Sequence, residues 1–343
     1  MKKFGWILVG LGVFVAAVSL LSRLYMYDRI AVVPLDQDTV SVSQGPGATI
    51  FDIASREEIT LDLVSTRNVV GDVAASEDAS KDLDRDVAVW ETLVYTDEPG
   101  ATVDEDNPPR SSTHDRVAFD RHTGEALDCC GSYTASTADI GSGEEIRDED
   151  TPITGQYFKL PFQSEKKTYQ FWDGSLKDST DLEYQAAEKI EGLQVYRYQQ
   201  VIEPTTVGQL TAPASFFGIE EDGDVELDRV YSNTRTLWIE PETGVIIRGQ
   251  EEQNTVAEYQ GEEVATLTDV TIGYDDQTIS DNVETYSALA TQLKVVRFWL
   301  PVVGTIVGLL VLLAGVVLVA RGRRSGGAHA ADSDVDDRER TSV

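Results

Sequence analysis

The sequence predicts a β-rich (α+β) domain, mostly antiparallel sheet with hairpins, flanked by N- and C-terminal transmembrane helices. Three observations predict this fold class. Two long apolar runs lie near the two ends of the 343-residue chain. Between them, many short segments alternate polar and apolar residues with a period of two, as strands do. Turn sequences rich in glycine, proline and aspartate separate these segments.

The second apolar run, residues 295–320, predicts a transmembrane helix. From Phe298 to Ala320 no side chain is ionisable. About 20 apolar residues span the hydrocarbon core of a bilayer, because a helix rises only about 1.5 Å per residue. Lys294 and Arg297 precede this stretch, and three arginines lie within the four residues that follow it.

The first apolar run predicts a matching helix over residues 4–25. Tyr25 and Tyr27, at its end, suit the aromatic belt of a membrane interface. A cleaved signal peptide is the alternative interpretation. However, the run is longer than the apolar core of such a peptide, and no small-residue cleavage site follows it. We therefore expect an uncleaved anchor.

Basic residues outside the two runs predict the orientation. Lys2 and Lys3 precede the first run, and the arginine cluster follows the second. By the positive-inside rule, residues 1–3 and 321–343 are expected to be cytoplasmic. The predicted protein therefore crosses the cell membrane twice, with residues 26–294 forming the extracytoplasmic domain. The charged tail is expected to be disordered.

The charge balance limits the possible partners. The chain has 28 basic and 60 acidic residues, a net charge of −32. Without the two termini, 20 basic and 55 acidic residues remain, so the middle region alone carries about −35. Nucleic acid is excluded as a partner, because phosphate binding needs a basic surface. Solubility of an exposed surface is the simplest reason for the excess of acid.

Several segments predict strands because their residues alternate or have high β-propensity. These segments are residues 59–63, 87–95, 156–162, 166–172 and 264–272. Residues 41–48 are expected to form a turn, since they contain Gly-Pro-Gly. Residues 71–86 are expected to form a surface loop, because this segment is rich in acidic residues and in residues with small side chains. Residues 281–297 lose the strand period and predict a helix.

Three hairpins are expected. In two of them the first strand ends in an acidic residue. A short turn that ends in Thr-Gly then leads into the second strand. These two turns are Asp120–Gly124 and Glu240–Gly244. A glycine at this position supplies the positive φ that closes a type I turn with a bulge. The third hairpin joins residues 182–189 to 193–201 across Glu191 and Gly192.

Four stretches carry a resemblance to a known family. They are residues 116–131 (RVAFDRHTGEALDCCG), 160–172 (LPFQSEKKTYQFW), 192–199 (GLQVYRYQ) and 233–253 (NTRTLWIEPETGVIIRGQEEQ). Together with the two-anchor layout, they resemble the actinobacterial PorA family of membrane proteins, a domain of unknown function. The resemblance covers nearly the whole chain, except residues 71–86 and the tail after residue 324.

The resemblance implies a cell-envelope protein of bacteria with mycolate-type walls or of their relatives. Some family members are associated with the maturation of lipomannan-type lipoglycans, and others carry only the porin name. No catalytic residue comes with the resemblance.

The only two cysteines are adjacent, Cys129 and Cys130. Three states are open to them: a vicinal disulfide, two free thiols, or bridges to another chain. Because thiols outside the membrane are expected to oxidise, and no other cysteine competes, we favour the vicinal disulfide. A metal site is not expected, since the two thiolates and His122 lack a fourth ligand at zinc-type spacing.

The sequence gives no sign of catalysis. It contains neither a Ser-His-Asp order nor a G-x-S-x-G elbow. Many carboxylates are present, but none is singled out as a glycosidase pair. We therefore predict a protein that is not an enzyme and has no cofactor.

Aromatic residues in the predicted strands are the candidate ligand contacts. Most aromatic side chains in strands belong to the core, but several could line a lipid-binding groove. The candidates for contact with lipid are Phe158, Phe162, Phe171, Trp172, Tyr196, Tyr198 and Trp238.

These observations predict a membrane-anchored protein that binds or transfers an envelope lipid or lipoglycan precursor. One alternative is a glycan-modifying enzyme with paired carboxylates, and others are a scaffold for envelope synthases and an oligomeric porin. An elongated apolar cavity favours the carrier, and a deep acidic cleft favours the enzyme. A filled core with one exposed apolar patch favours the scaffold.

Overall fold

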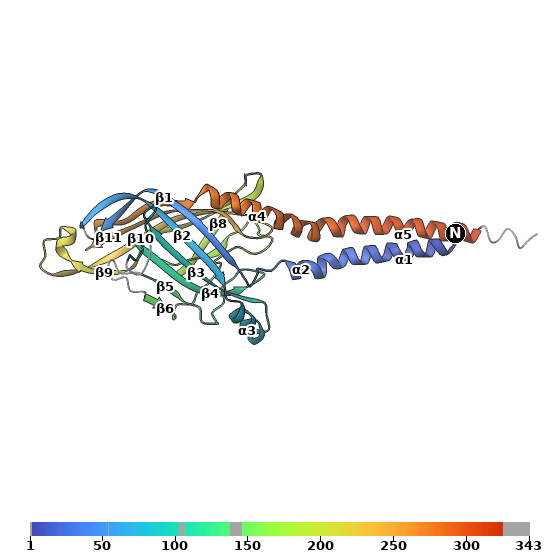
Figure 1. Cartoon of the computed structure of the whole chain (residues 1–343), viewed down its shortest axis with the longest axis horizontal. Helices are drawn as coiled ribbons and strands as arrows, with labels where there is room; N and C mark the ends of the chain where they lie inside the picture. Colours follow the sequence, from blue (N-terminus) through green and yellow to red (C-terminus); the bar gives the residue numbers. More distant parts are fainter. Residues whose placement is uncertain (1, 54, 103–106, 138–145, 325–343) are drawn as a thin grey trace, which may run out of the picture. The chain divides into compact units, whose positions relative to one another are not determined.

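The computed structural model describes residues 2–53, 55–102, 107–137 and 146–324. The chain forms two compact units. A helical unit comprises Met1–Ala31 and Thr291–Val343, and a sheet unit comprises Val32–Ala290 (Figure 1). The tail predicted to be disordered lies, from residue 325 onward, outside the described residues.

The helical unit contains the two apolar runs. Its first arm is α1 (Lys2–Leu21), η1 (Ser22–Met26) and α2 (Tyr27–Ile30). Its second arm follows the helix α4 (Asp276–Lys294) and consists of η3 (Val295–Trp299) and α5 (Leu300–Arg324). Both arms contain helices long and apolar enough to cross a membrane. The predicted spans, 4–25 and 295–320, lie within them.

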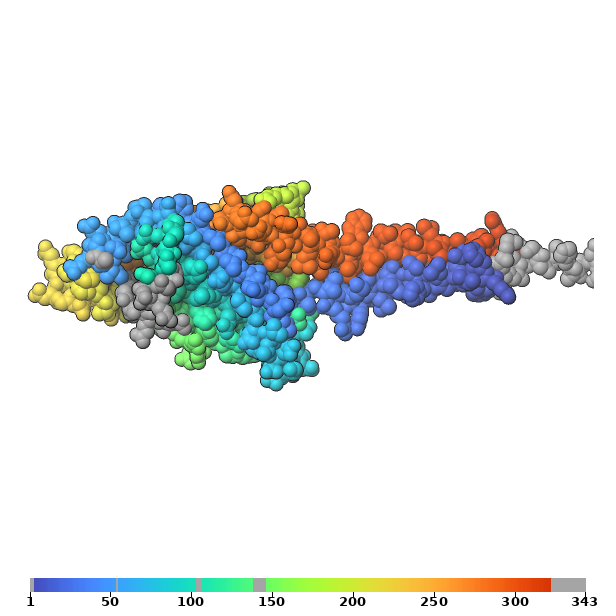
Figure 2. All heavy atoms as spheres, in the orientation of Figure 1, coloured from blue at the N-terminus to red at the C-terminus, as the bar shows by residue number. Residues whose placement is uncertain are grey.

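Small residues bring α1 and α5 into close contact. Gly5 faces Gly315, Gly12 faces Gly308, and Ser19 faces Gly304, so the two helices run antiparallel. In Figure 2 their atoms touch along the length of the pair. A Cβ added at Gly12 would lie 2.5 Å from the backbone nitrogen of Leu312. Such close approach is how helices associate in lipid, where no hydrophobic effect drives them together.

We expect the substitution Gly12→Leu to separate α1 from α5, because the new side chain collides with the α5 backbone. Spin labels at positions 3 and 321, with both native cysteines replaced by serine, report the distance between the helix ends. A narrow distance distribution should become broad in the variant. Gly10→Leu is the matched control, since nothing lies within 4 Å of a Cβ at Gly10. Equal distributions in the two variants would contradict this packing.

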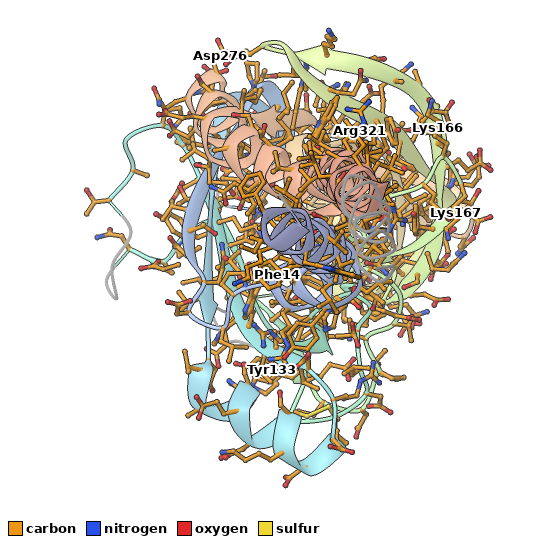
Figure 3. All side chains as sticks on the ribbon, turned by 90° about the vertical axis from the view of Figure 1, so that its right-hand side faces the viewer. Phe14, Tyr133, Lys166, Lys167, Asp276 and Arg321 are labelled. Carbon is orange, nitrogen blue, oxygen red and sulfur yellow. A yellow bond between two sulfur atoms is a disulfide. The ribbon has the colours of Figure 1, made fainter. Side chains whose placement is uncertain are left out.

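The described part of the sheet unit contains a single antiparallel sheet of twelve strands, which forms a half-barrel (Figure 1). The fold class predicted from the sequence is therefore confirmed. Viewed from the end in Figure 3, the strands curve around an interior. In spatial order the strands are β6 (Ile146–Asp148), β5 (Thr134–Ser136), β4 (Ser111–Asp120), β3 (Val87–Asp97), β2 (Glu57–Gly71), β1 (Asp38–Asp52), β12 (Glu262–Tyr274), β11 (Ile246–Tyr259), β10 (Asp224–Ile239), β9 (Leu193–Pro213), β8 (Asp178–Ile190) and β7 (Tyr169–Asp173). The short η2 (Ala214–Phe217) follows β9.

The two Thr-Gly turns have the same internal hydrogen bonds. Glu240 accepts from the amide of Thr243 through its carboxylate, and its carbonyl accepts from Gly244. In the other turn, the carboxylate of Asp120 accepts from the amide of Thr123, and its carbonyl accepts from the amide of Gly124. The second turn joins β10 to β11 as predicted, whereas only a short bridge follows the first. The third hairpin, β8 with β9, also forms.

The half-barrel is bridged at the end where these turns lie. Backbone hydrogen bonds connect β4 to residues 125–127. Residues 125–127 bond in turn to residues 155 and 156, and Gln156 bonds to β7. In particular, the amide of Ala126 donates to Gly155, and the amide of Trp172 donates to Gln156. The strands near the two edges of the sheet are thereby linked, so the interior is enclosed by backbone at this end.

Residues 156–164 cap this end of the interior. They were expected to contain a strand, over residues 156–162, but apart from bridges at Gln156 they form none. Their amides instead bond to the two turns: Leu160 donates to Gly244, and Phe162 donates to His122. Gly244 has a φ of +75°, and a side chain there would collide with the carbonyl of Leu160. The prediction was wrong because two distant turns satisfy these amides, which a local pattern does not reveal.

Two other local predictions were also wrong. The turn expected at residues 41–48 lies within β1, where a bulge between Gly45 and Ala48 absorbs the irregular sequence. The loop expected at residues 71–86 contains the helix α3 (Val73–Leu83). Asp72 caps this helix by accepting from the amide of Ala75.

The helices α3 and α4 pack on the outer surface of the sheet unit. Ala79 of α3 packs against Val87 and Val89 of β3. Val283 of α4 packs against Val195 and Ile247. Asp276, at the start of α4, lies at the outside of the sheet in Figure 3. This arrangement leaves the opposite face of the strands to line the interior.

Candidate functional site

The two faces of the half-barrel differ in chemistry. The face that carries Arg67, Thr92, Tyr198 and Arg235 is called the inward face. The opposite face is called the outward face. Many outward side chains are exposed and polar or charged, including Glu58, Thr60, Asp62, Asp181, Glu183, Glu226, Glu252 and Asp269. Since a strand facing lipid needs an apolar outward band, these strands are built to lie in water.

Apolar and aromatic residues fill the inward face at the capped end. One cluster joins Leu160 of the cap to strands β7 to β11, and contains Tyr169, Phe171, Leu182, Tyr198, Leu237, Ile239 and Ile246. A second cluster contains Val33, Val69, Ala88, Trp90 and Phe119, with Phe158 and Phe162 of the cap packed against it. Burial of these side chains stabilises the cap, at about 25 cal/mol for each Å² of apolar surface removed from water.

Further apolar residues line the inward face away from the cap. Ala48, Leu63 and Val270 form one cluster, with Ile272 packed against it. Another is built on Val225, Leu227, Ala257 and Leu267, near η2. A polar belt separates these clusters from the capped end.

Arg235 is the centre of one half of this polar belt. Its guanidinium lies 3.0 Å from the Asp173 carboxylate and 2.9 Å from that of Glu251, and it also donates to the side chain of Gln200. The Arg235 side chain is 12% exposed and that of Asp173 only 1%. Burial alone lowers the pKa of Arg235, but the two carboxylates outweigh it and raise the pKa above its ordinary value. Arg235 therefore stays charged inside the sheet.

Arg67 lies in the other half of the belt. Its Nε donates to Thr92 Oγ1 at 3.1 Å. Its guanidinium carbon lies 5.8 Å and 5.6 Å from the ring centroids of Tyr157 and Phe158. Nearby Asp115 accepts from the hydroxyl of Tyr157 and the amide of Ala135. Burial raises the pKa of the Asp115 carboxyl.

The structure divides the seven predicted aromatic contacts into groups. Phe171, Tyr196 and Tyr198 lie together in the first cluster, and Phe158 and Phe162 lie in the second. Trp172 contacts Phe158 in a further cluster with Val117. Trp238 is on the outward face beneath α4, where its Nε1 donates to Glu188, so it does not share a surface with the others. Contact with lipid remains a prediction for all seven.

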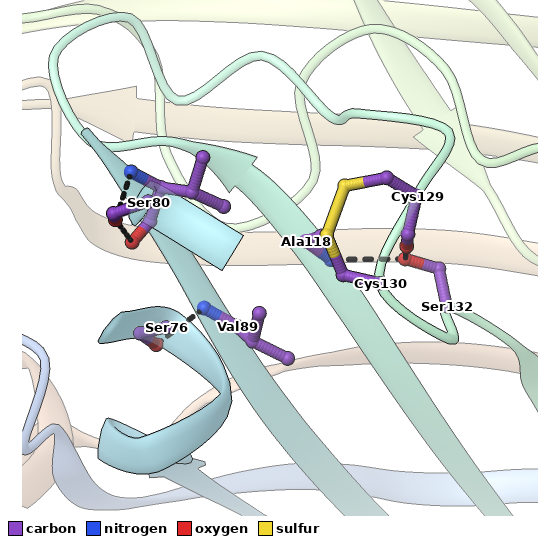
Figure 4. The surroundings of a disulfide bond; sticks show 8 residues. Ser76, Ser80, Val89, Ala118, Cys129, Cys130 and Ser132 are labelled. Atoms are coloured by element: carbon purple, nitrogen blue, oxygen red, sulfur yellow. Dashed lines mark hydrogen bonds between the residues drawn. A yellow bond between two sulfur atoms is a disulfide. The ribbon is translucent and has the colours of Figure 1, made fainter. Parts of the chain in front are cut away.

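Cys129 and Cys130 are bonded Sγ to Sγ in the structure (Figure 4). They pack beside Ala118 in the cluster beneath α3. The Ser132 hydroxyl donates to the carbonyl of Cys129 and accepts from the amide of Ala118, which fixes the turn. The pair lies on the outward side, away from the polar belt. Its redox state in the cell remains a prediction.

A shallow cleft of about 560 Å³ lies beside the start of α4. Arg248, Tyr274 and Asp276 are among its lining residues, and none of the seven predicted aromatic contacts lines it. Across the described ranges, no three His, Cys, Asp or Glu side chains are grouped to hold a metal ion. The inward face is therefore the better candidate site.

Comparison with known proteins gives the family. The family described as Porin PorA matches residues 4–317, which include the whole sheet unit and most of both helical arms. The chain belongs to the PorA family. A Porin PorA of Corynebacterium amycolatum is 25% identical over 300 residues, covering 73% of this chain and 77% of that protein. A Porin PorA of Corynebacterium resistens is 23% identical over 284 residues, covering 63% of this chain and 68% of that protein.

Membership of the PorA family confirms the resemblance predicted from the sequence and makes this chain a membrane protein. The name of these relatives denotes a channel and not an enzyme, in agreement with the predicted lack of catalysis. Sequence reasoning missed the polar belt. Its signal was present in β2, where Leu61, Leu63 and Arg67 share one face by the period of two.

Proposed function

We propose that the sheet unit binds an amphipathic envelope lipid or lipoglycan precursor on its inward face and hands it on without chemistry. The contrast between the two faces carries this proposal. Exposed charges on the outward face favour water, whereas the inward face combines apolar clusters with a polar belt. A lipid presents the same combination of acyl chain and head group. A lipomannan-type precursor is the finer form of the proposal, and it rests on the family resemblance.

We further propose that α1 and α5 anchor this unit in the cell membrane. Their antiparallel pairing places both chain ends at one end of the helical pair. With lysines at one end of the chain and arginines at the other, the positive-inside rule makes that end cytoplasmic. The sheet unit is then extracytoplasmic, where envelope precursors are assembled.

Pore formation is the second candidate, and the name of the Corynebacterium relatives favours it. One copy offers no obvious water path, because α1 and α5 are apolar all round and pack through glycines. The outward charges also oppose insertion of the strands into lipid. A pore would therefore require several copies. A scaffold for envelope synthases is a third possibility.

Native mass spectrometry of the gently solubilised protein tests the carrier. We expect co-purified lipid at about one molecule per chain. Ser65→Trp should reduce the bound lipid because it fills the inward face of β2, whereas Thr66→Trp, on the outward face, should not. Lipid-free protein that conducts ions in planar bilayers would instead support the pore.

A further inference from the structure

Arg67 differs from several arginines of the sheet unit that pair with carboxylates. Arg235, Arg116, Arg85, Arg110 and Arg197 each lie within 4 Å of at least one carboxylate. Arg67 has no such ion pair, and its two Nη groups have no hydrogen-bond partner among the described residues. Arg56, Arg121, Arg229 and Arg248 likewise have no carboxylate within 4 Å among the described residues, but none of them lies against two aromatic rings as Arg67 does.

The surroundings hold the guanidinium in place without neutralising it. Thr92, which accepts from its Nε, is 1% exposed. The rings of Tyr157 and Phe158 lie against the guanidinium, and Phe158 is itself wedged between Trp90 and Phe119 at 5.2 Å and 5.3 Å. Stacking on rings leaves the guanidinium charge and its outer N–H fork available.

Asp115, an inward acid that interacts electrostatically with Arg67, is already engaged in hydrogen bonds. Asp115 receives one hydrogen bond at each carboxylate oxygen, from Ala135 and from Tyr157. A second buried donor nearby also lacks an acceptor: the indole Nε1 of Trp90, on the same face of β3 as Thr92. The site therefore has spare donors, and its guanidinium has no ion pair among the described residues. An anion with several oxygens satisfies both, and phosphate fits the guanidinium fork through two parallel hydrogen bonds.

The apolar residues of the same strand give the direction of the rest of the ligand. Leu63 and Leu61 follow Arg67 on the inward face of β2, with Ser65 between. At about 3.3 Å per residue, Leu63 lies roughly 13 Å along the strand from Arg67. A phosphate at Arg67 would thus have an apolar path beside it of the scale of an acyl chain.

We propose that Arg67 binds the phosphate of an anionic phospholipid or phosphorylated glycolipid whose chains lie along Leu63 and Leu61. This inference rests on the proposed function, since it names the head group that the inward face selects.

The test uses the full chain in detergent micelles, with short-chain phosphatidylglycerol, short-chain diacylglycerol and inorganic phosphate as separate probes. We expect phosphatidylglycerol to bind at least about tenfold more tightly than diacylglycerol, because only phosphatidylglycerol carries a phosphate for Arg67, and hydrogen bonds between charged groups contribute about 1.5–3 kcal/mol. Arg67→Gln should remove this preference while diacylglycerol still binds. Arg67→Lys keeps the charge without the fork and should retain part of it. Arg56→Gln, at the exposed turn between β1 and β2, is the control and should change nothing.

The outcomes separate the two proposals. Absence of binding for every lipid would overturn the proposed function. Lipid binding without a head-group preference, or a preference that survives in Arg67→Gln, would overturn only the role of Arg67. If inorganic phosphate binds as tightly as phosphatidylglycerol, and Arg67→Gln abolishes it, the ligand is a free phosphate and the lipid assignment is wrong.

Discussion

Replacing Arg235 by methionine is expected to destabilise the sheet unit by roughly 3–5 kcal/mol, because two carboxylates then remain in the interior without their cation. Asp173 is nearly inaccessible to water, with 1% of its side chain exposed, so hydration cannot replace the lost partner. For a domain of this size, such a loss lowers Tm by roughly 10 °C. Thermal unfolding of the full chain in micelles, followed by tryptophan fluorescence, measures it.

A matched control distinguishes the cost of leaving buried carboxylates without a cation from the cost of losing an ion pair at the surface. Arg197 lies 2.7 Å from Glu188, but both side chains are more than one third exposed. Arg197→Met should therefore cost less than about 1 kcal/mol. The triple variant Arg235→Met, Asp173→Asn, Glu251→Gln should recover part of the lost stability, because no carboxylate is left without its cation around position 235. If Arg235→Met is as stable as Arg197→Met, the belt does not hold the strands together.

Lys159→Met should stabilise the protein at pH 7 by about 2–4 kcal/mol, the second large effect. Lys159 is 3% exposed, and its Nζ has no hydrogen-bond partner among the described residues. The Nζ lies 3.6 Å from the centroid of the Phe162 ring. Burial lowers the pKa of Lys159 to about 7, against a weaker opposing effect of Asp120. The native state therefore carries a costly buried ammonium that methionine removes.

The same shift predicts how stability depends on pH. The unfolded chain holds this proton up to its ordinary pKa of 10.5, whereas the native state releases it near pH 7. Between these values the unfolded state binds more protons, so the free energy of unfolding rises as the pH increases from 7 towards 10. Denaturant titrations at pH 7, 8 and 9 should show this rise in the wild type and in Lys166→Met, an exposed control. Lys159→Met should lack it, and an unchanged slope in that variant would contradict the assignment.

Local sequence signals predicted the parts of the fold that local chemistry determines. The Glu240–Gly244 turn closes through hydrogen bonds between residues no more than four apart, so its Thr-Gly ending was enough to predict the β10–β11 hairpin. The helix α3 left a weaker signal. Asp72 is a good N-cap, and Ser76 and Ala79 are buried three residues apart, but the acidic composition of the segment obscured both.

Long-range chemistry was beyond sequence reasoning. Asp173 and Arg235 are 62 residues apart. Only the side-by-side order of the strands β7, β8, β9 and β10 in the sheet brings them together. The cap residues looked like a strand because they alternate, yet their amides bond to turns far along the chain. For the same reason, the period of two could place Arg67 on the inward face, but it could not show that Arg67 has no ion pair. The lack of an ion pair depends on the contacts that every neighbouring acid makes.

Photo-crosslinking in cells tests the central claim most directly. A benzophenone amino acid placed at Thr255 lies on the inward face of β11, and one at Asn254 lies on the outward face. The two positions differ by a single residue, so expression and membrane insertion should match. If the inward face carries lipid, illumination should yield a lipid adduct at position 255 and none at position 254. Equal labelling at both positions, or none at either, would contradict the account.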